Sequence, residues 1–220
     1  MAKTVFVDLE TTGLVPKMMV NGKRGRMKKE QIPYDTMFDK YPRVVSGAWK
    51  VDDDPTYYSV LNQEGNPIPK EASDIHKITD QIANSSNVTF IHFINNFILQ
   101  SSGNDIVVGF NMYYDTSIIK ANVLREIKNG RLTQKHYDVI CDILDKDKRI
   151  DVMRRAMKMM GGFATLQAVH MKIFRRGFDA HNAQNDVDAL KRIYDWMLPR
   201  GIVPSLEELK QKALERDDDD

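Results

Sequence analysis

Two carboxylates on one face of a predicted strand near the start of the chain constrain the fold more than any other feature. The stretch from Thr4 to Gly13 reads TVFVDLETTG, and its alternating β-branched residues predict a strand. Residues i and i+2 share a face of a strand, so Asp8 and Glu10 point one way while the valines and Leu9 point the other way. Neighbouring carboxylates repel unless a cation lies between them, and carboxylate oxygens are ligands that Mg²⁺ and Mn²⁺ prefer. The stretch therefore predicts a divalent-metal site, with an exposed strand that is merely acidic as the alternative.

The composition is ordinary for a soluble globular protein. The chain has 220 residues, of which 42% are hydrophobic and 29% are charged, enough to bury a core without cross-links. Its one cysteine, Cys141, excludes an internal disulfide and a cysteine-based zinc site, and it fits a reducing cytoplasm. Asp8 and Glu10 interrupt the apolar run near the amino terminus, and no stretch of about 18 apolar residues occurs. We therefore expect a cytoplasmic protein with no secretory signal and no membrane insertion.

The net charge of +1 conceals a local asymmetry. The segment from Lys17 to Glu30 carries six cations and one acid, and the segment from Arg154 to Arg176 carries six cations and no acid. Two basic patches in a nearly neutral protein indicate a polyanion bound across one surface. Solvated helix faces and a solvated loop are the alternative for either patch. The acidic tail, Asp217 to Asp220, is expected to be solvated and to bind no metal.

The remaining strand signals predict a mixed α/β sheet. Strands are expected at 43–51 and 56–62, and the short turn between them makes this pair antiparallel. The apolar run at 105–109 has the pattern of a buried parallel strand. Helical spacing follows it and ends with an amphipathic helix at 187–198 that Pro199 terminates. The sequence therefore predicts three antiparallel strands followed by parallel strands, flanked by helices.

A long connection separates the first predicted strand from the second. It runs from Leu14 to Pro42 and contains Asn21-Gly22, a tight-turn signal that predicts a small basic hairpin. Neither an internal repeat nor a second domain is evident from the sequence. We therefore predict one domain at 1–199 with a basic insertion at about 15–42, followed by a C-terminal extension at 200–220.

Two further acidic residues and a histidine occupy positions from which a fold gains no stability. Asp115 follows the buried strand, near the carboxyl end where open α/β sheets build their sites. Asp186 lies in the first turn of the last predicted helix, on the face that also carries Leu190 and Ile193, so it faces inward. His181 lies in the loop that enters this helix, and an imidazole beside a metal-bound water can take its proton. Buried carboxylates that converge need a cation, so these residues extend the predicted metal site.

Four short motifs occur along the chain in the order DLETTG, IHKIT, NMYYD and HNAQND. In this order and spacing the sequence resembles the DEDDh 3′-to-5′ exonucleases of the ribonuclease-H-like superfamily, from Lys3 to about Leu198. That family includes proofreading subunits of bacterial replicative polymerases and several RNA-trimming enzymes. The sister branch has a tyrosine four residues before the last aspartate, where this chain has Asn182, so His181 matches the histidine branch.

The resemblance implies a ribonuclease-H-like fold, two-metal-ion catalysis and a role for each motif residue. Asp8, Glu10 and Asp186 are expected to hold one Mg²⁺ or Mn²⁺ ion, and Asp8 and Asp115 a second one. His181 is expected to be the general base. The residues expected to bind the 3′-terminal nucleotide are Thr11, Thr12, Leu14, Ile75, His76, Asn111 and Tyr114.

The resulting hypothesis is a metal-dependent exonuclease that removes nucleoside 5′-monophosphates from the 3′ ends of single-stranded nucleic acid. DNA is favoured over RNA as the substrate. An exoribonuclease that uses the same site is one alternative, because contacts to the 2′-hydroxyl cannot be read from sequence. A non-catalytic nucleic-acid-binding or replisome module is the other. The expected partners are single-stranded DNA or RNA ends, with a polymerase or replisome as a further candidate.

Overall fold

A five-stranded mixed sheet forms the centre of the structure, a computed structural model that describes residues 2–21 and 27–217. The strands lie in the order β5-β4-β1-β6-β7. Strand β4 is antiparallel to both β1 and β5, whereas β6 is parallel to β1 and β7 is parallel to β6. The strand bounds are β1 Thr4–Thr11, β4 Val44–Val51, β5 Tyr57–Val60, β6 Ile106–Gly109 and β7 Arg149–Asp151. The predicted α/β class, with antiparallel strands first and parallel strands later, is confirmed.

Strand β1 is the central strand of this sheet, and its second half extends beyond its parallel neighbour. On one side β4 pairs with β1 as far as Thr11, with a register shift after Glu10. On the other side β6 pairs with only the first three residues of β1, Thr4 to Phe6. Asp8 and Glu10 therefore lie past the carboxyl end of β6, where polar side chains can reach a site at the sheet edge.

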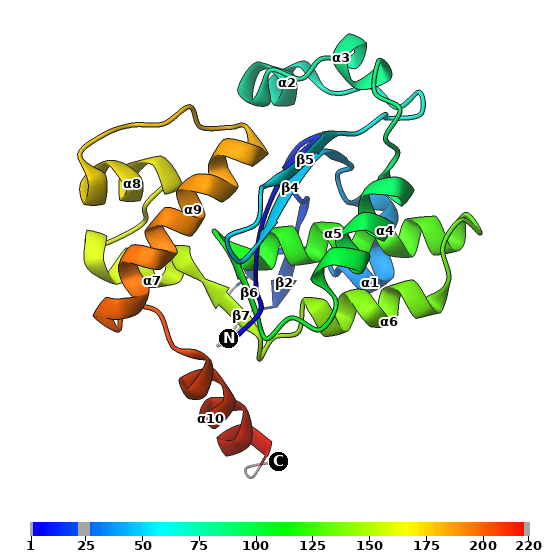
Figure 1. Ribbon diagram of the computed structural model, residues 1–220. Coiled ribbons are helices and arrows are strands. Elements are labelled where there is room, and N and C mark those ends of the chain that lie inside the picture. Colours follow the sequence, from blue (N-terminus) through cyan, green and yellow to red (C-terminus); the bar gives the residue numbers. More distant parts are fainter. Residues whose placement is uncertain (1, 22–26, 218–220) are drawn as a thin grey trace.

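Helices cover both faces of the sheet (Figure 1). One face is covered by α1 (Tyr34–Met37), α4 (Phe90–Ser101), α5 (Met112–Lys128) and α6 (Gln134–Ile143). The other face is covered by α7 (Val152–Met160), α8 (Leu166–Phe174) and α9 (Ala183–Met197). The remaining helices lie outside these layers: α2 (Lys70–His76), α3 (Asp80–Asn84) and α10 (Leu206–Asp217). Short 3₁₀ turns occupy Phe38–Lys40 and Leu198–Arg200.

Alternation along β1 divides the core into two layers. Val5, Val7 and Leu9 are buried against the α4–α5–α6 side. Phe6 is buried on the opposite side, where its ring meets the Tyr194 ring edge-on with centroids 5.3 Å apart. Asp8 and Glu10 share the face of Phe6, because strand side chains alternate. The hydrophobic half of β1 thus fixes the register that directs both carboxylates toward α9.

The predicted basic insertion contains a two-stranded sheet. Strands β2 (Lys17–Asn21) and β3 (Met27–Gln31) pair antiparallel, as expected for a hairpin. The predicted Asn21-Gly22 turn continues into residues 22–26, which lie outside the described part of the chain, as do residues 218–220 of the acidic tail.

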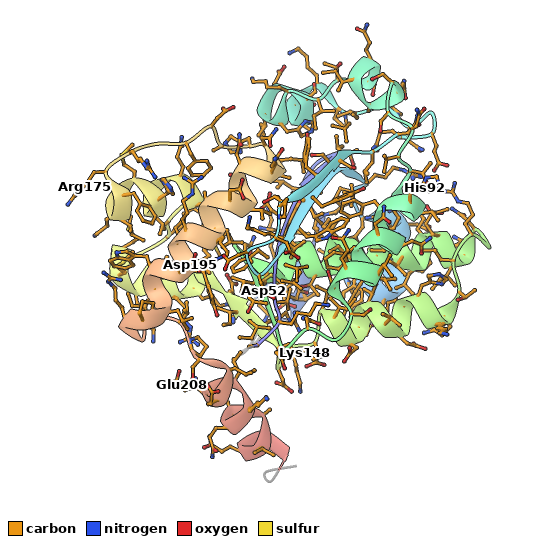
Figure 2. All side chains as sticks on the ribbon, in the orientation of Figure 1. Asp52, His92, Lys148, Arg175, Asp195 and Glu208 are labelled. Carbon is orange, nitrogen blue, oxygen red and sulfur yellow. The ribbon has the colours of Figure 1, made fainter. Side chains whose placement is uncertain are left out.

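Charged side chains cover the outside of the molecule. Arg175 at the end of α8 and Glu208 on α10 lie at the surface (Figure 2). Among residues 2–21 and 27–217, every helix is too short or too polar to cross a bilayer.

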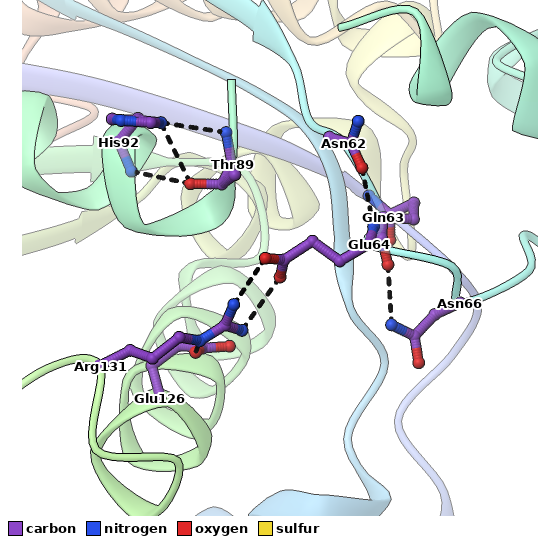
Figure 3. A network of polar contacts seen from close by, with 8 residues as sticks. All are labelled: Asn62, Gln63, Glu64, Asn66, Thr89, His92, Glu126 and Arg131. Carbon is purple, nitrogen blue, oxygen red and sulfur yellow. Dashed lines mark hydrogen bonds and ion pairs between the residues drawn. The ribbon is translucent and has the colours of Figure 1, made fainter. Parts of the chain in front are cut away.

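An ion-pair network joins the loop after β5 to the end of α5 (Figure 3). The guanidinium of Arg131 pairs with Glu64, at 2.5 Å, and with the buried carboxylate of Glu126, also at 2.5 Å. At the start of α4, His92 and Thr89 form a capping box (Figure 3). The Arg131–Glu64 pair thus ties the loop that leads from β5 toward α2 to the end of α5.

Candidate metal centre

Three carboxylates from two elements converge beside β1. One oxygen from each of Asp8, Glu10 and Asp186 lies within 4.8 Å of the other two. The first two come from alternate positions of β1, and the third comes from the first turn of α9, which packs across β1 and β4. The structure therefore brings together three of the predicted metal ligands.

The loop before α9 fixes the third carboxylate of this group. Oδ2 of Asp186 accepts the backbone N–H of His181 at 3.0 Å. His181 adopts a left-handed backbone conformation, with φ of +67°, which turns its N–H toward the helix. The side chain of Asn182 then caps α9 by accepting the N–H groups of Gln184 and Asn185, at 3.1 and 3.3 Å. The backbone N–H of His181 thus holds the Asp186 carboxylate in place.

In the described part of the chain, no cation lowers the pKa of any of these three carboxyl groups. Burial, together with the charge of Asp186, raises the pKa of Glu10 to about 7. Burial likewise raises the pKa of Asp186 to about 7. The pKa of Asp8 is well above its ordinary value, first through burial and then through the charges of Asp115, Asp186 and Glu10. Three acids that disfavour their own ionised forms, with oxygens this close, fit a divalent cation.

Asp115 approaches the same centre from α5. It is buried, and burial holds its pKa well above the ordinary value. Its charge also raises the pKa of Asp8, although it is not one of the three carboxylates that lie within 4.8 Å of one another. Its position follows from a tight turn: a Cβ on Gly109 would lie 2.1 Å from the Met112 sulfur. Asp115 is therefore a buried neighbour of the three carboxylates.

A small cavity of about 230 Å³ opens onto the carboxylates, and we call it the metal cavity. His181 lines it together with Asp8, Glu10 and Asp186, and its ring is exposed. The cavity is also lined by Phe110 and by residues 165–167, which no sequence motif indicated. The predicted base and the predicted ligands thus share one cavity.

A second, larger cavity of about 600 Å³ borders Glu10, and we call it the terminal groove. All seven residues expected to bind the terminal nucleotide line it: Thr11, Thr12, Leu14, Ile75, His76, Asn111 and Tyr114. Leu14 is 86% exposed and Ile75 is 54% exposed. Two exposed apolar side chains beside a polar wall suit a ligand with a flat apolar face, and a nucleobase has one.

Hydrogen bonds hold the wall of the terminal groove. The hydroxyls of Thr11 and Tyr114 lie 2.8 Å apart, and each lies 2.8 Å from the carbonyl oxygen of Gly13. Burial raises the pKa of Tyr114 to about 12. Arg43 and Thr12 form a reciprocal pair, in which the Arg43 N–H donates to Thr12 Oγ1 and the Thr12 N–H donates to the Arg43 carbonyl, both at 2.9 Å.

The other wall of the groove is the end of α2. Nδ1 of His76 accepts the backbone N–H of Ile78 at 3.1 Å, and burial lowers the pKa of His76. The ring is therefore a neutral group at neutral pH, with its Nδ1 committed to the loop. Lys77, with φ of +63°, reverses the chain after the helix.

The sheet order and the helical layers together define a mixed α/β fold that solved exonuclease structures share. Solved structures of exonucleases match it. Exonuclease I from Methylocaldum szegediense has a TM-score of 0.59 and 18% identity over 92% of this chain and 42% of that chain. E. coli exonuclease I in complex with a dT13 oligonucleotide has a TM-score of 0.60 and 16% identity over 89% of this chain and 43% of that chain. Exonuclease X in complex with 5′ overhanging duplex DNA has a TM-score of 0.52 and 17% identity over 94% of this chain and 96% of that chain.

The chain thus spans less than half of the exonuclease I chains but nearly all of the exonuclease X chain. No protein-family model matches the sequence, and no curated protein gives a significant match. The polymerase or replisome partner considered from the sequence finds no support in these comparisons.

Proposed function

We propose that this protein is a 3′-to-5′ exonuclease that hydrolyses the last phosphodiester bond of single-stranded nucleic acid and releases nucleoside 5′-monophosphates. DNA is the proposed substrate, and RNA is the alternative. The observation that supports this most strongly is the close approach of Asp8, Glu10 and Asp186 at the border of the terminal groove. A phosphate between the groove and these carboxylates would need metal ions to approach them at all, because like charges repel.

Each residue of the centre has a role in the proposed reaction. Asp8, Glu10 and Asp186 would hold one divalent ion, and Asp8 with Asp115 would hold a second. Mg²⁺ or Mn²⁺ bound there would lower the pKa of a coordinated water molecule and neutralise the charge that develops at phosphorus. His181 would take the proton of the attacking water, because its exposed ring lines the same cavity.

The terminal groove would bind the 3′-terminal nucleotide. Leu14 and Ile75 would contact the base, and the Thr11–Tyr114 hydroxyl pair would lie near the sugar. A base must leave its stack to occupy such a cavity, which costs least at a single-stranded end. The groove therefore favours single strands over paired ends.

A time course with 5′-labelled single-stranded DNA and RNA of one sequence tests the proposal. We expect a ladder that shortens from the 3′ end in Mg²⁺ and disappears in EDTA. Asp186→Asn should abolish it, since the cluster loses one anionic ligand. The matched control is Asp195→Asn on the same helix, whose carboxylate is half-exposed and pairs with Lys191 at 2.8 Å; it should leave the ladder intact.

The two substrates also decide between the alternatives. Faster shortening of RNA would favour the exoribonuclease. Binding of both oligonucleotides without any cleavage in Mg²⁺ or Mn²⁺ would contradict the proposal and favour a non-catalytic module.

A further inference from the structure

A third cavity, of about 520 Å³, lies beside the first turn of α5 and is lined mainly by cations. Tyr113 and Met112 form the wall nearest to the metal centre. The remaining wall comes from the segment around β7 and from α7, and its charged members are Lys146, Arg149, Asp151, Arg154, Arg155 and Lys158. Five cations face one acid here. We call this space the basic cavity.

Most of this positive charge is not neutralised within the protein. Arg154 lies 3.5 Å from Asp151, and the guanidinium of Arg149 donates to a backbone carbonyl. Among the described residues, the side chains of Lys146, Arg155 and Lys158 make no hydrogen bond or ion pair. A concave surface with unpaired cations attracts anions more strongly than a flat one, because its low-dielectric walls focus the field.

Helix α7 aligns these cations. Val152 and Ala156 are buried against the sheet, which leaves Arg154, Arg155 and Lys158 on the outer side. Arg154 and Lys158 are one turn apart, about 6 Å along the axis. Arg155 and Lys158 also line a further hollow of about 420 Å³, so the positive surface continues along the helix.

The basic cavity adjoins the metal centre directly. Oδ1 of Asp151 accepts the N–H of Asn111, a residue of the terminal groove, at 3.0 Å. The charge of Asp151 also contributes to the raised pKa of Asp115. Asn111 and Tyr114 line the groove, while Met112 and Tyr113 between them line the basic cavity. The two spaces therefore meet at one helical turn.

Neither space at the centre can hold more than the end of a strand. Among the residues that the structure describes, no lysine or arginine lines the terminal groove or the metal cavity. A polynucleotide whose 3′ end lies there must carry its remaining phosphates elsewhere, and in the described part of the chain the basic cavity is an adjoining hollow with excess positive charge. Tyr113, 49% exposed, offers a ring on which a base can stack.

We propose that the basic cavity binds the phosphodiester backbone of the substrate strand upstream of the scissile bond, through Arg155, Lys158 and their neighbours. This inference rests on the proposed exonuclease function. The other part of the basic segment, represented by Arg175 at the end of α8, lies at the surface outside the basic cavity (Figure 2). Binding at this site should not depend on base sequence, because lysine and arginine contacts to phosphates do not distinguish the bases.

The test uses Arg155→Gln/Lys158→Gln, which removes two unpartnered charges and leaves the metal ligands untouched. The control, Lys135→Gln/Lys210→Gln, removes two exposed charges from α6 and α10, remote from the centre. Binding of fluorescent 12-nucleotide single strands, and of duplexes of the same length, is measured in EDTA at several salt concentrations. Cleavage of the single-stranded 12-mer and of a thymidine dinucleotide, which is too short to reach the basic cavity, is measured in Mg²⁺.

We expect the double variant to bind the 12-mer on the order of tenfold more weakly, with a salt slope less steep by about 1.4. Dinucleotide cleavage should equal that of the wild type and of the control. Unchanged binding and an unchanged slope would overturn the proposal, as would an equal loss on the dinucleotide. Failure of the wild type to shorten the 12-mer in Mg²⁺ would instead contradict the exonuclease function, and the binding slope would still decide whether the cavity holds a strand. Weaker binding of duplex alone would assign the cavity to a complementary strand and overturn the proposal.

Discussion

His181 combines two tasks in one residue. Its backbone N–H holds the Asp186 carboxylate, and its ring lines the metal cavity. The backbone contact survives replacement of the side chain, so the two tasks can be separated by mutation. An L-residue accepts φ of +67° at modest cost, and only the imidazole is specific to histidine.

We predict that His181→Ala lowers kcat about 10²- to 10⁴-fold, because the attacking water loses its base. Metal binding followed by calorimetry should change little, since Asp186 keeps its N–H donor. The control is His136→Ala, which removes a helix cap remote from the centre. A rate near that of the wild type, with an unchanged pH profile, would assign the base to another group.

At the scale of elements, the turn from β6 to α5 determines where Asp115 lies. Gly109 ends the strand, and Met112 lies so close that a methyl group at position 109 would collide with its sulfur. The flexible end of Met112 and the start of α5 must both yield to such a group.

Gly109→Ala is therefore expected to destabilise the fold by about 1–3 kcal/mol, the usual cost of overpacking. The kcat should fall by more than the loss of folded protein explains, because Asp115 moves with the helix. Chemical denaturation and kcat measure the two effects. Gly162→Ala is the control, because nothing lies within 4 Å of its added Cβ. The double variant Gly109→Ala/Met112→Ala should regain part of the activity; if it does not, crowding at Met112 is not the cause.

The elements that the sequence revealed are those with a local periodic signal. The carboxylates of β1 follow from strand alternation, and Asp186 follows from the helical face that it shares with Leu190. By contrast, β7 has only three residues, Arg149–Asp151, with a charge at each end, too short for any periodicity. Its place in the sheet comes from pairing with β6, which is a tertiary contact.

Two missed helices carried local signals. Helix α10 begins with a reciprocal pair in which Ser205 N–H donates to Glu208 Oε2 at 2.8 Å and Glu208 N–H donates to Ser205 Oγ at 3.2 Å. Helix α8 begins at the cap Thr165, whose hydroxyl accepts the Ala168 N–H at 3.2 Å. No local signal could indicate Phe110 in the metal cavity, because its role there is only to form a wall.

At the scale of the whole molecule, the metal centre lowers the stability of the metal-free protein. The pKa values of Glu10 and Asp186 rise to about 7 on folding, so the folded chain holds protons that the unfolded chain has released. The penalty is absent below pH about 4, where both states are protonated, and complete above about 7.

We predict that in EDTA the contribution of these groups to stability falls as pH rises from about 4 to 7, and that Mg²⁺ restores it at pH 8. Asp8→Asn should raise Tm in EDTA, by about 2–4 °C for each kcal/mol of relieved repulsion, and should weaken the stabilisation by Mg²⁺. Thermal melts across this pH range measure both effects. A lower Tm for Asp8→Asn than for the wild type in EDTA would contradict this account of the carboxylates.

The carboxylates of the centre come from distant parts of the polypeptide, Asp8 on β1 and Asp186 on α9. During synthesis β1 leaves the ribosome early, whereas α9 emerges only after every other strand and most helices. The metal group cannot form until α9 packs across β1 and β4. A nascent chain therefore has no assembled carboxylate group until α9 has emerged, so under the proposed function the order of elements keeps the chain from hydrolysing the messenger RNA from which it is being translated.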